Sequence, residues 1–299
     1  MSDRSYMKLL FEKRFEEAEE VRKLEIPRTL YKYFPLGDID SMDDLRLSTL
    51  ENEEIWFSRT TLLNDPYEFR SCYVDEEKLK KIGIPQNMID VFNTMFDAQH
   101  YMYCITCLTE NGYDYLPMWG LYTNNSKGFC VEYEVTNPEY VYKVSYEKGR
   151  VGLANSLVNR SSAYYRSLKR EEQSDDMKLY DKIFFSNLLI KHESWAPESE
   201  YRIIRPTFSD TSYLETFVDE MENFFNGDEQ AKSNLEKIKG HSWKLEQSGL
   251  KTKRIFSGVN CSLSHQKELN RISVKLGCGP LKVLALGTKE YTLTPKNFV

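Results

Sequence analysis

A short acidic segment near residue 200 holds the side chains best suited to chemistry. It reads Trp195-Ala-Pro-Glu198-Ser-Glu200-Tyr-Arg202. If residues 198–204 form a strand, Glu198, Glu200 and Arg202 point to one face, because side chains alternate along a strand. The two carboxylates then lie roughly 7 Å apart. The spacing therefore predicts a pair of neighbouring carboxylates on one strand face.

Two carboxylates this close need a neighbouring cation, because their repulsion otherwise raises one of the two pKa values. Arg202, Lys191 and His192 are near enough in the sequence to supply it. One carboxylate of such a pair can bind a cationic or hydroxyl-bearing ligand while the other acts as a base. The alternative is the solvated face of an ordinary edge strand, which composition alone favours.

Two other segments could contribute to a site. Asn64-Asp65-Pro66-Tyr67-Glu68 is a turn directly after a predicted strand, where binding residues are often found. Lys32, between Tyr31 and Tyr33, could contact a phosphate or pair with one of the two glutamates. A structural turn and a structural ion pair are the competing interpretations. The stretch from Met118 to Tyr122 is typical of core.

Several kinds of site have no signal in the sequence. There is no GxGxxG or P-loop motif, no HExxH and no GxSxG. Cys104-Ile-Thr-Cys107 has CxxC spacing but lacks the second pair of ligands that a structural zinc site needs. Six scattered cysteines and four dispersed histidines predict neither a disulfide framework nor a metal centre. We therefore expect no metal.

The charge of the chain limits its partners. A net charge of −6 argues against broad binding to nucleic acid, although residues 232–254 are locally basic. No stretch approaches the roughly 20 apolar residues that span a membrane, and the charged N-terminus lacks a signal core. The sequence therefore predicts a cytoplasmic protein that does not contact a membrane.

The pattern of elements predicts an α+β protein. Residues 1–26 are expected to form an amphipathic helix, which could pair with a second copy of the chain. Residues 27–299 are expected to form a single domain with a helical insertion at about 211–255. Strands and helices come in runs rather than strict alternation, which favours a mixed, mainly antiparallel sheet with flanking helices. The last two strands are expected at 271–276 and 281–286.

Taken in order, these segments resemble a bacterial family catalogued as domain of unknown function 2971. The resemblance extends over residues 29–290. Its most specific parts are the Asn64–Glu68 turn and the Trp195–Arg202 segment. Further parts are Leu30-Tyr-Lys-Tyr33, Ile55-Trp-Phe-Ser58, Gly128-Phe-Cys-Val131 and Leu281-Lys-Val-Leu-Ala-Leu-Gly287.

The layout is also similar to that of ADP-ribosyltransferases, which implies a related fold and the use of NAD. Those enzymes carry a cation on a first strand, a serine on a second and a Glu-x-Glu motif on a later one. Lys32, Ser58 and Glu198-Ser199-Glu200 match these places in order. Two features depart from the pattern. Lysine replaces the usual Arg or His, and Ser58-Arg59-Thr60 replaces Ser-Thr-Ser.

This resemblance implies a transferase or glycohydrolase that acts on NAD, for example a bacterial toxin or a phage-defence effector. Glu200 would bond the nicotinamide ribose and stabilise the positive charge that develops as nicotinamide leaves. Glu198 would orient or activate the acceptor, and the sequence does not say whether that acceptor is a protein or a nucleic acid. The expected binding residues are Lys32, Ser58, Asn64, Asp65, Glu68 and Arg202. One alternative is a non-catalytic ligand-binding or signalling module of a stress or defence system. The other is a nuclease that holds a divalent metal with Asp65, Glu68 and Glu198.

Overall fold

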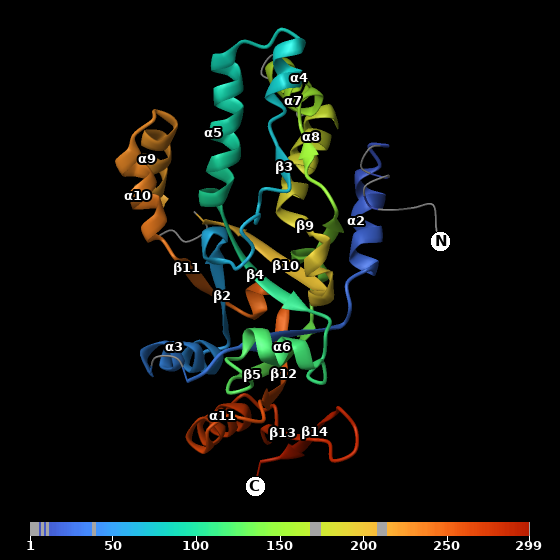
Figure 1. The fold of residues 1–299 in the computed structure, drawn as a ribbon, viewed down its shortest axis with the longest axis vertical. Helices are drawn as coiled ribbons and strands as arrows, with labels where there is room; N and C mark the ends of the chain where they lie inside the picture. The colour runs from blue at the N-terminus through green and yellow to red at the C-terminus, as the bar shows by residue number, and fades with distance from the viewer. Residues whose placement is uncertain are drawn as a thin grey trace.

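The computed structural model describes residues 6, 9, 12–37, 40–167, 175–207 and 214–298. A large sheet crosses the middle of the molecule, with helices above it, below it and at both sides (Figure 1). The α-helices are α2 (Phe15–Leu24), α3 (Asp40–Glu51), α4 (Glu76–Lys81), α5 (Gln86–Met102), α6 (Leu116–Tyr122), α7 (Asn155–Ser167), α8 (Asp175–Ser186), α9 (Leu214–Phe225), α10 (Glu229–Lys237) and α11 (Leu263–Lys275). Among the described residues, no helix is long and apolar enough to cross a membrane.

The main sheet is mixed and mainly antiparallel, as the sequence predicts. Its strands follow the order β11-β2-β4-β1-β5-β12-β13-β14, and β10 pairs with both β4 and β6. Within the described part of this main sheet, only the β12–β13 pair is parallel. These strands are β1 (Thr29–Phe34), β2 (Glu54–Arg59), β4 (Tyr103–Thr109), β5 (Phe129–Val135), β6 (Val141–Lys143), β10 (Glu200–Pro206), β11 (Gly240–Lys244), β12 (Leu250–Ser257), β13 (Lys282–Leu286) and β14 (Leu293–Asn297).

Two short parallel pairs lie outside the main sheet. Strand β3 (Cys72–Tyr73) pairs with β8 (Val151–Gly152), and β7 (Ser145–Glu147) pairs with β9 (Ile190–His192). The second pair places Lys191 near the start of β10. It therefore holds a cation that lies only seven residues before Glu198 beside the acidic segment.

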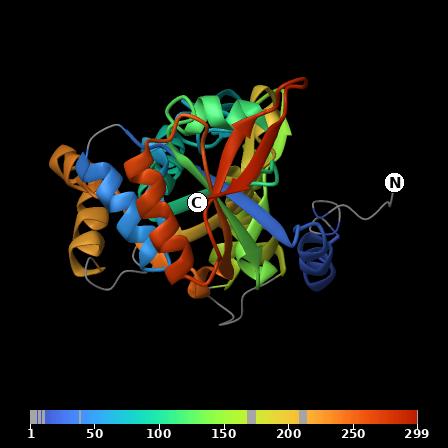
Figure 2. The same ribbon diagram turned by 90° about the horizontal axis from the view of Figure 1, so that it is seen from below.

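The main core lies where α3 and α11 pack against the sheet and each other (Figure 2). Leu47 and Leu50 of α3 meet Leu269 and Ile272 of α11 over the apolar side chains of β1, β2 and β5. A separate cluster joins Trp119 of α6 to β1, β5 and β12. The strands that carry the candidate residues are thus fixed by burial of apolar side chains, the main stabilising term in folding.

Strand β4 is the place where the sheet divides. One edge of β4 pairs with β10 along its whole length. The other edge pairs with β2 at Cys104 and Ile105, and with β1 only at Thr109. Between these points, residues 106–108 pair with neither β1 nor β2 in the described sheet. The divergence of β1 from β2 leaves an opening in the centre of the molecule.

Outside the acidic segment, two predicted elements differ from the structure. Residues 271–276 are not a strand, because α11 continues to Lys275. Its N-cap, Ser262, accepts the amide of His265, and Leu269 and Ile272 are buried at helical spacing. The predicted helical insertion at about 211–255 is correct only where α9 and α10 lie. Residues 240–257 contribute β11 and β12 to the main sheet.

Part of the predicted N-terminal helix is present as α2, from Phe15 to Leu24. It follows a turn in which Lys13 has a φ of 58°. Residues 1–5, 7–8 and 10–11 lie outside the described residues. Arg22 is buried against the same chain, where it donates to the carbonyl of Val141 at 2.5 Å. Self-association through this helix stays a prediction.

Candidate functional site

A cavity of about 200 Å³ occupies the opening between β1 and β2. Six of the eight site residues predicted from the sequence line it: Lys32, Ser58, Asn64, Glu68, Glu198 and Glu200. The rest of its wall consists of Tyr31, Tyr33, Leu63, Ile105, Cys107, Leu108, Thr109, Met118, Tyr122 and Lys191. The split in the sheet therefore brings together residues that are up to 168 positions apart in the sequence, from Lys32 to Glu200.

Glu198 and Glu200 do not share a strand, so the expected strand over 198–204 is wrong at its first two residues. Glu198 ends a 3-10 helix, η4 (Glu193–Glu198), and β10 begins at Glu200. Ser199 joins them in the left-handed conformation, with φ 46° and ψ 54°. A non-glycine residue in this region costs about 1–2 kcal/mol. This turn, rather than strand alternation, directs both carboxylates towards one cation.

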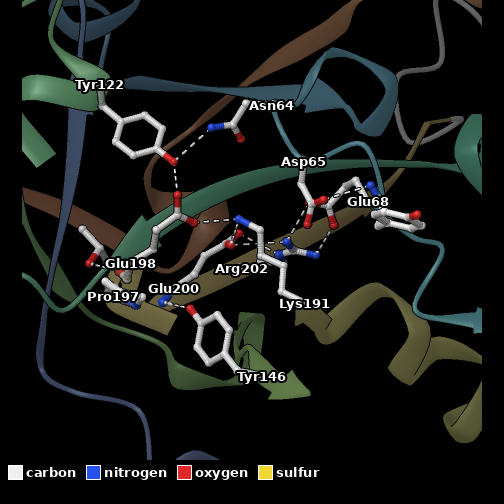
Figure 3. A network of polar contacts seen from close by, with 12 residues as sticks. Asn64, Asp65, Glu68, Tyr122, Tyr146, Lys191, Pro197, Glu198, Glu200 and Arg202 are labelled. Carbon is white, nitrogen blue, oxygen red and sulfur yellow. Dashed lines mark hydrogen bonds and ion pairs between the residues drawn. The ribbon is translucent and has the colours of Figure 1, made fainter. Parts of the chain in front are cut away.

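That cation is Lys191, whose Nζ donates to Glu198 Oε2 at 2.6 Å and to Glu200 Oε2 at 3.0 Å (Figure 3). Its ammonium also lies 4.6 Å from the ring centroid of Trp195. Burial opposes the charge, but Glu200 and Glu198 raise the pKa of Lys191 above its ordinary value. Lys191 therefore stays protonated. His192, the other nearby candidate, is exposed and contacts Ser194 instead.

Arg202 lies behind the cavity wall and is fully buried, so it is not a direct ligand contact. Its guanidinium donates to both oxygens of Glu68 at 2.7 and 3.0 Å, and its Nε donates to Glu200 Oε1 at 2.7 Å. A further bond of 2.6 Å reaches the carbonyl of Leu188. Because arginine presents several donors in a rigid plane, it can hold two carboxylates in fixed positions at once. Arg202 thus positions Glu200.

The charge of Glu200 is secured by these two cations. Burial by itself would raise the pKa of its carboxyl, but Arg202 and Lys191 outweigh burial and lower the pKa to about 2. At neutral pH Glu200 is ionised and unsuited to carrying a proton. Its backbone amide donates to the hydroxyl of Tyr146 at 2.8 Å, which fixes the start of β10.

Asn64 and Tyr122 complete the opposite side of the cavity. The hydroxyl of Tyr122 donates to Glu198 Oε1, and Asn64 Nδ2 donates to the same hydroxyl at 3.2 Å. Burial and the carboxylate of Glu198 raise the pKa of Tyr122, so this hydroxyl keeps its proton. The sequence missed Tyr122, because its neighbours Met118 and Trp119 are indeed core residues. Because Tyr122 lies on the same short helix, its spacing alone could not show whether it belongs to the core or to the site.

Asp65 lies outside the cavity. Its Oδ1 accepts the amide of Tyr67 at 2.8 Å within its own turn, and its side chain borders a neighbouring groove. This bond shapes the turn that delivers Asn64 and Glu68. Asp65, Glu68 and Glu198 therefore do not converge on one point. The described residues contain no cluster of acidic, histidine or cysteine side chains that could hold a metal ion.

Lys32 reaches the cavity from β1. Its Nζ donates to the carbonyl of Cys107 at 2.9 Å, which satisfies part of the β4 edge that no strand covers. Burial lowers the pKa of Lys32. Ser58 lines the cavity at the end of β2, where it pairs with Ile105. Lys32 and Ser58 thus flank the opening on the two strands that diverge.

The ion-paired groups of the site, which do not include Lys32, carry an excess of negative charge. The linked groups comprise three carboxylates, Glu68, Glu198 and Glu200, and two cations, Lys191 and Arg202. Their formal charges sum to −1. Such a site can bind hydroxyl groups and stabilise positive charge that develops on a ligand.

Part of this site lies in a stretch of the chain that is similar to a known family. The family described as "Protein of unknown function (DUF2971)" matches residues 118–203. This is less than a third of the chain and narrower than the resemblance over 29–290 that the motifs suggest. No curated protein and no solved structure matched the chain. The matched stretch runs from α6 into β10 and includes Tyr122, Lys191, Glu198, Glu200 and Arg202, so the acidic half of the site lies within the region of family similarity.

Proposed function

We propose that the protein is an enzyme that breaks the N-glycosidic bond of NAD, as a glycohydrolase or as an ADP-ribosyltransferase. The observation that carries this proposal is the meeting of Glu198 and Glu200 with Lys32 and Ser58 around one cavity. These are the residues that resemble the ADP-ribosyltransferase pattern. An exposed strand face, the competing interpretation of the acidic segment, does not fit side chains that are 8% and 3% exposed.

The chemistry assigns different roles to the two glutamates. Loss of nicotinamide leaves positive charge on the ribose, and a fixed carboxylate lowers the energy of that state. Glu200 suits this task, because Lys191 and Arg202 keep it ionised and immobile. Glu198 lies at the edge of the network, against Tyr122, where it would orient the hydroxyl or water that attacks the sugar.

The size of the cavity limits how much of the substrate it can enclose. A cavity of 150 Å³ accommodates benzene, so about 200 Å³ suffices for one substituted ring. We propose that the nicotinamide end enters beside Tyr122 and that the rest of the dinucleotide lies outside. An aromatic ring next to the cationic nicotinamide would favour this pose.

The test is release of nicotinamide from NAD, measured by liquid chromatography with the purified full-length protein. We expect Glu200→Gln and Glu198→Gln each to reduce the rate about 100- to 1,000-fold, as for removal of a preorganised electrostatic group. Glu77→Gln, an exposed carboxylate on α4, is the matched control and should leave the rate unchanged. Circular dichroism must first show that each variant is folded. No release by the wild type, with no rise in melting temperature on adding NAD, would contradict the proposal.

One observation favours a second candidate, a ligand-binding or signalling module without catalysis. Every carboxylate of the network is paired with a cation, and the network links η4, β9, β10 and the Asn64–Glu68 turn. Such a network of ion pairs could serve only to stabilise the fold. In that case Glu200→Gln would lower stability, and NAD would remain intact with the wild type.

A further inference from the structure

The two lysines of the cavity are held in different ways. Lys191 is bonded to two carboxylates. Lys32, within the described part of the chain, has no carboxylate within ion-pairing distance. Its nearest partners are the carbonyl of Cys107, at 2.9 Å, and the ring of Phe34, whose centroid lies 5.7 Å from Nζ. One lysine is thus locked as an ammonium, while the other faces the same cavity without a counter-ion.

The surroundings of Lys32 favour the neutral amine. Burial between β4 and β5 lowers its pKa, and the opposing effects of Cys107 and Glu200 are smaller. The other ionisable groups that line the cavity are Tyr31, Tyr33, Glu68, Tyr122, Lys191 and Glu198. Glu198 and Glu200 are bonded to Lys191 and Glu68 is bonded to Arg202, so none of these carboxylates forms an ion pair with Lys32. Desolvation of a lysine is a recognised way to make an amine nucleophilic.

The hydrogen bond to Cys107 also suits an amine that reacts. A neutral amine can donate one N–H to this carbonyl and keep its lone pair directed elsewhere. Because the carbonyl belongs to the rigid centre of the sheet, it holds Nζ at the cavity wall. The remaining hydrogen-bonding groups around the cavity, on Ser58, Asn64, Tyr122 and Glu198, suit a ligand that carries hydroxyl groups.

We propose that Lys32 forms an imine with the aldehyde group of a small hydroxylated ligand, such as the open-chain form of a reducing sugar. The lone pair of Nζ attacks the carbonyl carbon, and a proton passes from nitrogen to oxygen to give a carbinolamine. Loss of water then gives the imine, so that amine and aldehyde yield imine and water with no oxidant or reductant. The second proton of Nζ leaves with the hydroxyl as water, so Lys191 remains an ammonium throughout.

This activity goes beyond cleavage of NAD and does not depend on it. A lysine that only bound a phosphate would remain charged, and arginine could replace it. The two roles therefore differ in a measurable way, because an imine requires a neutral primary amine and a phosphate contact requires a cation.

The experiment is reductive trapping with glycolaldehyde and cyanoborohydride on the full chain, without NAD, followed by peptide mass spectrometry of each lysine. At pH 7 we expect Lys32 to be labelled at least ~10-fold faster than Lys148, because desolvation supplies more neutral amine. Lys148 is the exposed reference, with 86% of its side chain accessible. Lys191 shares the cavity and should stay unlabelled, because its pKa is raised.

The pH dependence of labelling shows whether Lys32 reacts faster because its amine is neutral or only because the aldehyde reaches it more easily. The ratio of Lys32 to Lys148 labelling should be highest near neutral pH and fall towards one above about 10.5, where an ordinary lysine is also neutral. Lys32→Arg should abolish the cavity adduct, whereas Lys148→Arg should leave it intact. Labelling of Lys32 no faster than that of Lys148 at pH 7, or no labelling at all, would overturn the proposal. Neither result depends on whether NAD is cleaved.

Discussion

Replacement of Glu200 by glutamine removes the charge that Lys191 and Arg202 share while it keeps the size of the side chain. The carboxyl has a pKa of about 2 in the folded protein, against an ordinary value of 4.5. Each tenfold change in proton affinity corresponds to about 1.4 kcal/mol, so the ionised form is stabilised by about 3 kcal/mol. Glu200 is only 3% exposed, so solvent does not screen this contribution. We expect Glu200→Gln to lower the free energy of unfolding by about 3 kcal/mol at pH 7.

The contribution of Glu200 to the free energy of unfolding depends on pH, and the direction of this dependence follows from the pKa shift. Because the folded pKa lies below the unfolded one, the unfolded chain binds more protons between these two values. The contribution of Glu200 is therefore complete above about pH 4.5 and is lost as the pH falls towards 2. The gap in stability between wild type and Glu200→Gln should shrink to about half or less by pH 3.

The assay is urea unfolding followed by tryptophan fluorescence from pH 7 to pH 3. The slope against urea must be unchanged, so that the midpoint reports stability alone. Glu77→Gln, a fully solvated carboxylate, is the control and should stay within about 0.5 kcal/mol of the wild type. A gap below about 1 kcal/mol at pH 7, or one that stays constant down to pH 3, would refute the assigned role of Glu200.

Three further changes test the network and a second buried group. Arg202→Met leaves Glu68 without its bidentate partner and should cost about 3–5 kcal/mol in urea unfolding, whereas a loss below about 1 kcal/mol would show that the pair is dispensable. Tyr122→Phe removes the hydroxyl that donates to Glu198 and should cost about 1–2 kcal/mol in thermal melts, with an unchanged melt as the contrary result. Burial lowers the pKa of His100 to about 4, so its neutral form stabilises the fold above pH 6.5 and this contribution is lost as the pH falls to 4. In His100→Gln the unfolding free energy should therefore depend less on pH between 6.5 and 4, and an equally steep profile would contradict this.

Much of the fold was predictable where local pattern and burial agree. The apolar run at 281–286 predicted a strand, and β13 lies there. Prediction failed at 271–276, because the run Arg-Ile-Ser-Val-Lys-Leu also alternates like a strand. The segment instead forms part of α11, because the helix packs against α3 and is capped at Ser262. Residues 240–257 were mistaken for part of an insertion, because their partners β2 and β5 lie more than 100 positions away.

The candidate site was predicted by residue type better than by geometry. Lys32, Asn64, Glu198 and Glu200 do line one cavity, as the order of motifs indicated. The left-handed turn at Ser199 could not be read from the sequence, because serine rarely adopts it without tertiary support.

The sequence by itself determined which chemical groups are available: a lysine on an early strand, a polar turn and two glutamates near an arginine. It also determined that they belong to an α+β chain. Only the tertiary structure decided that β1 and β2 part along β4, that β9 delivers Lys191 to both glutamates, and that Asp65 and Arg202 lie outside the cavity. The reason is that strand register and buried ion pairs depend on partners far apart in the sequence, whose positions are set by packing of the whole core rather than by local pattern.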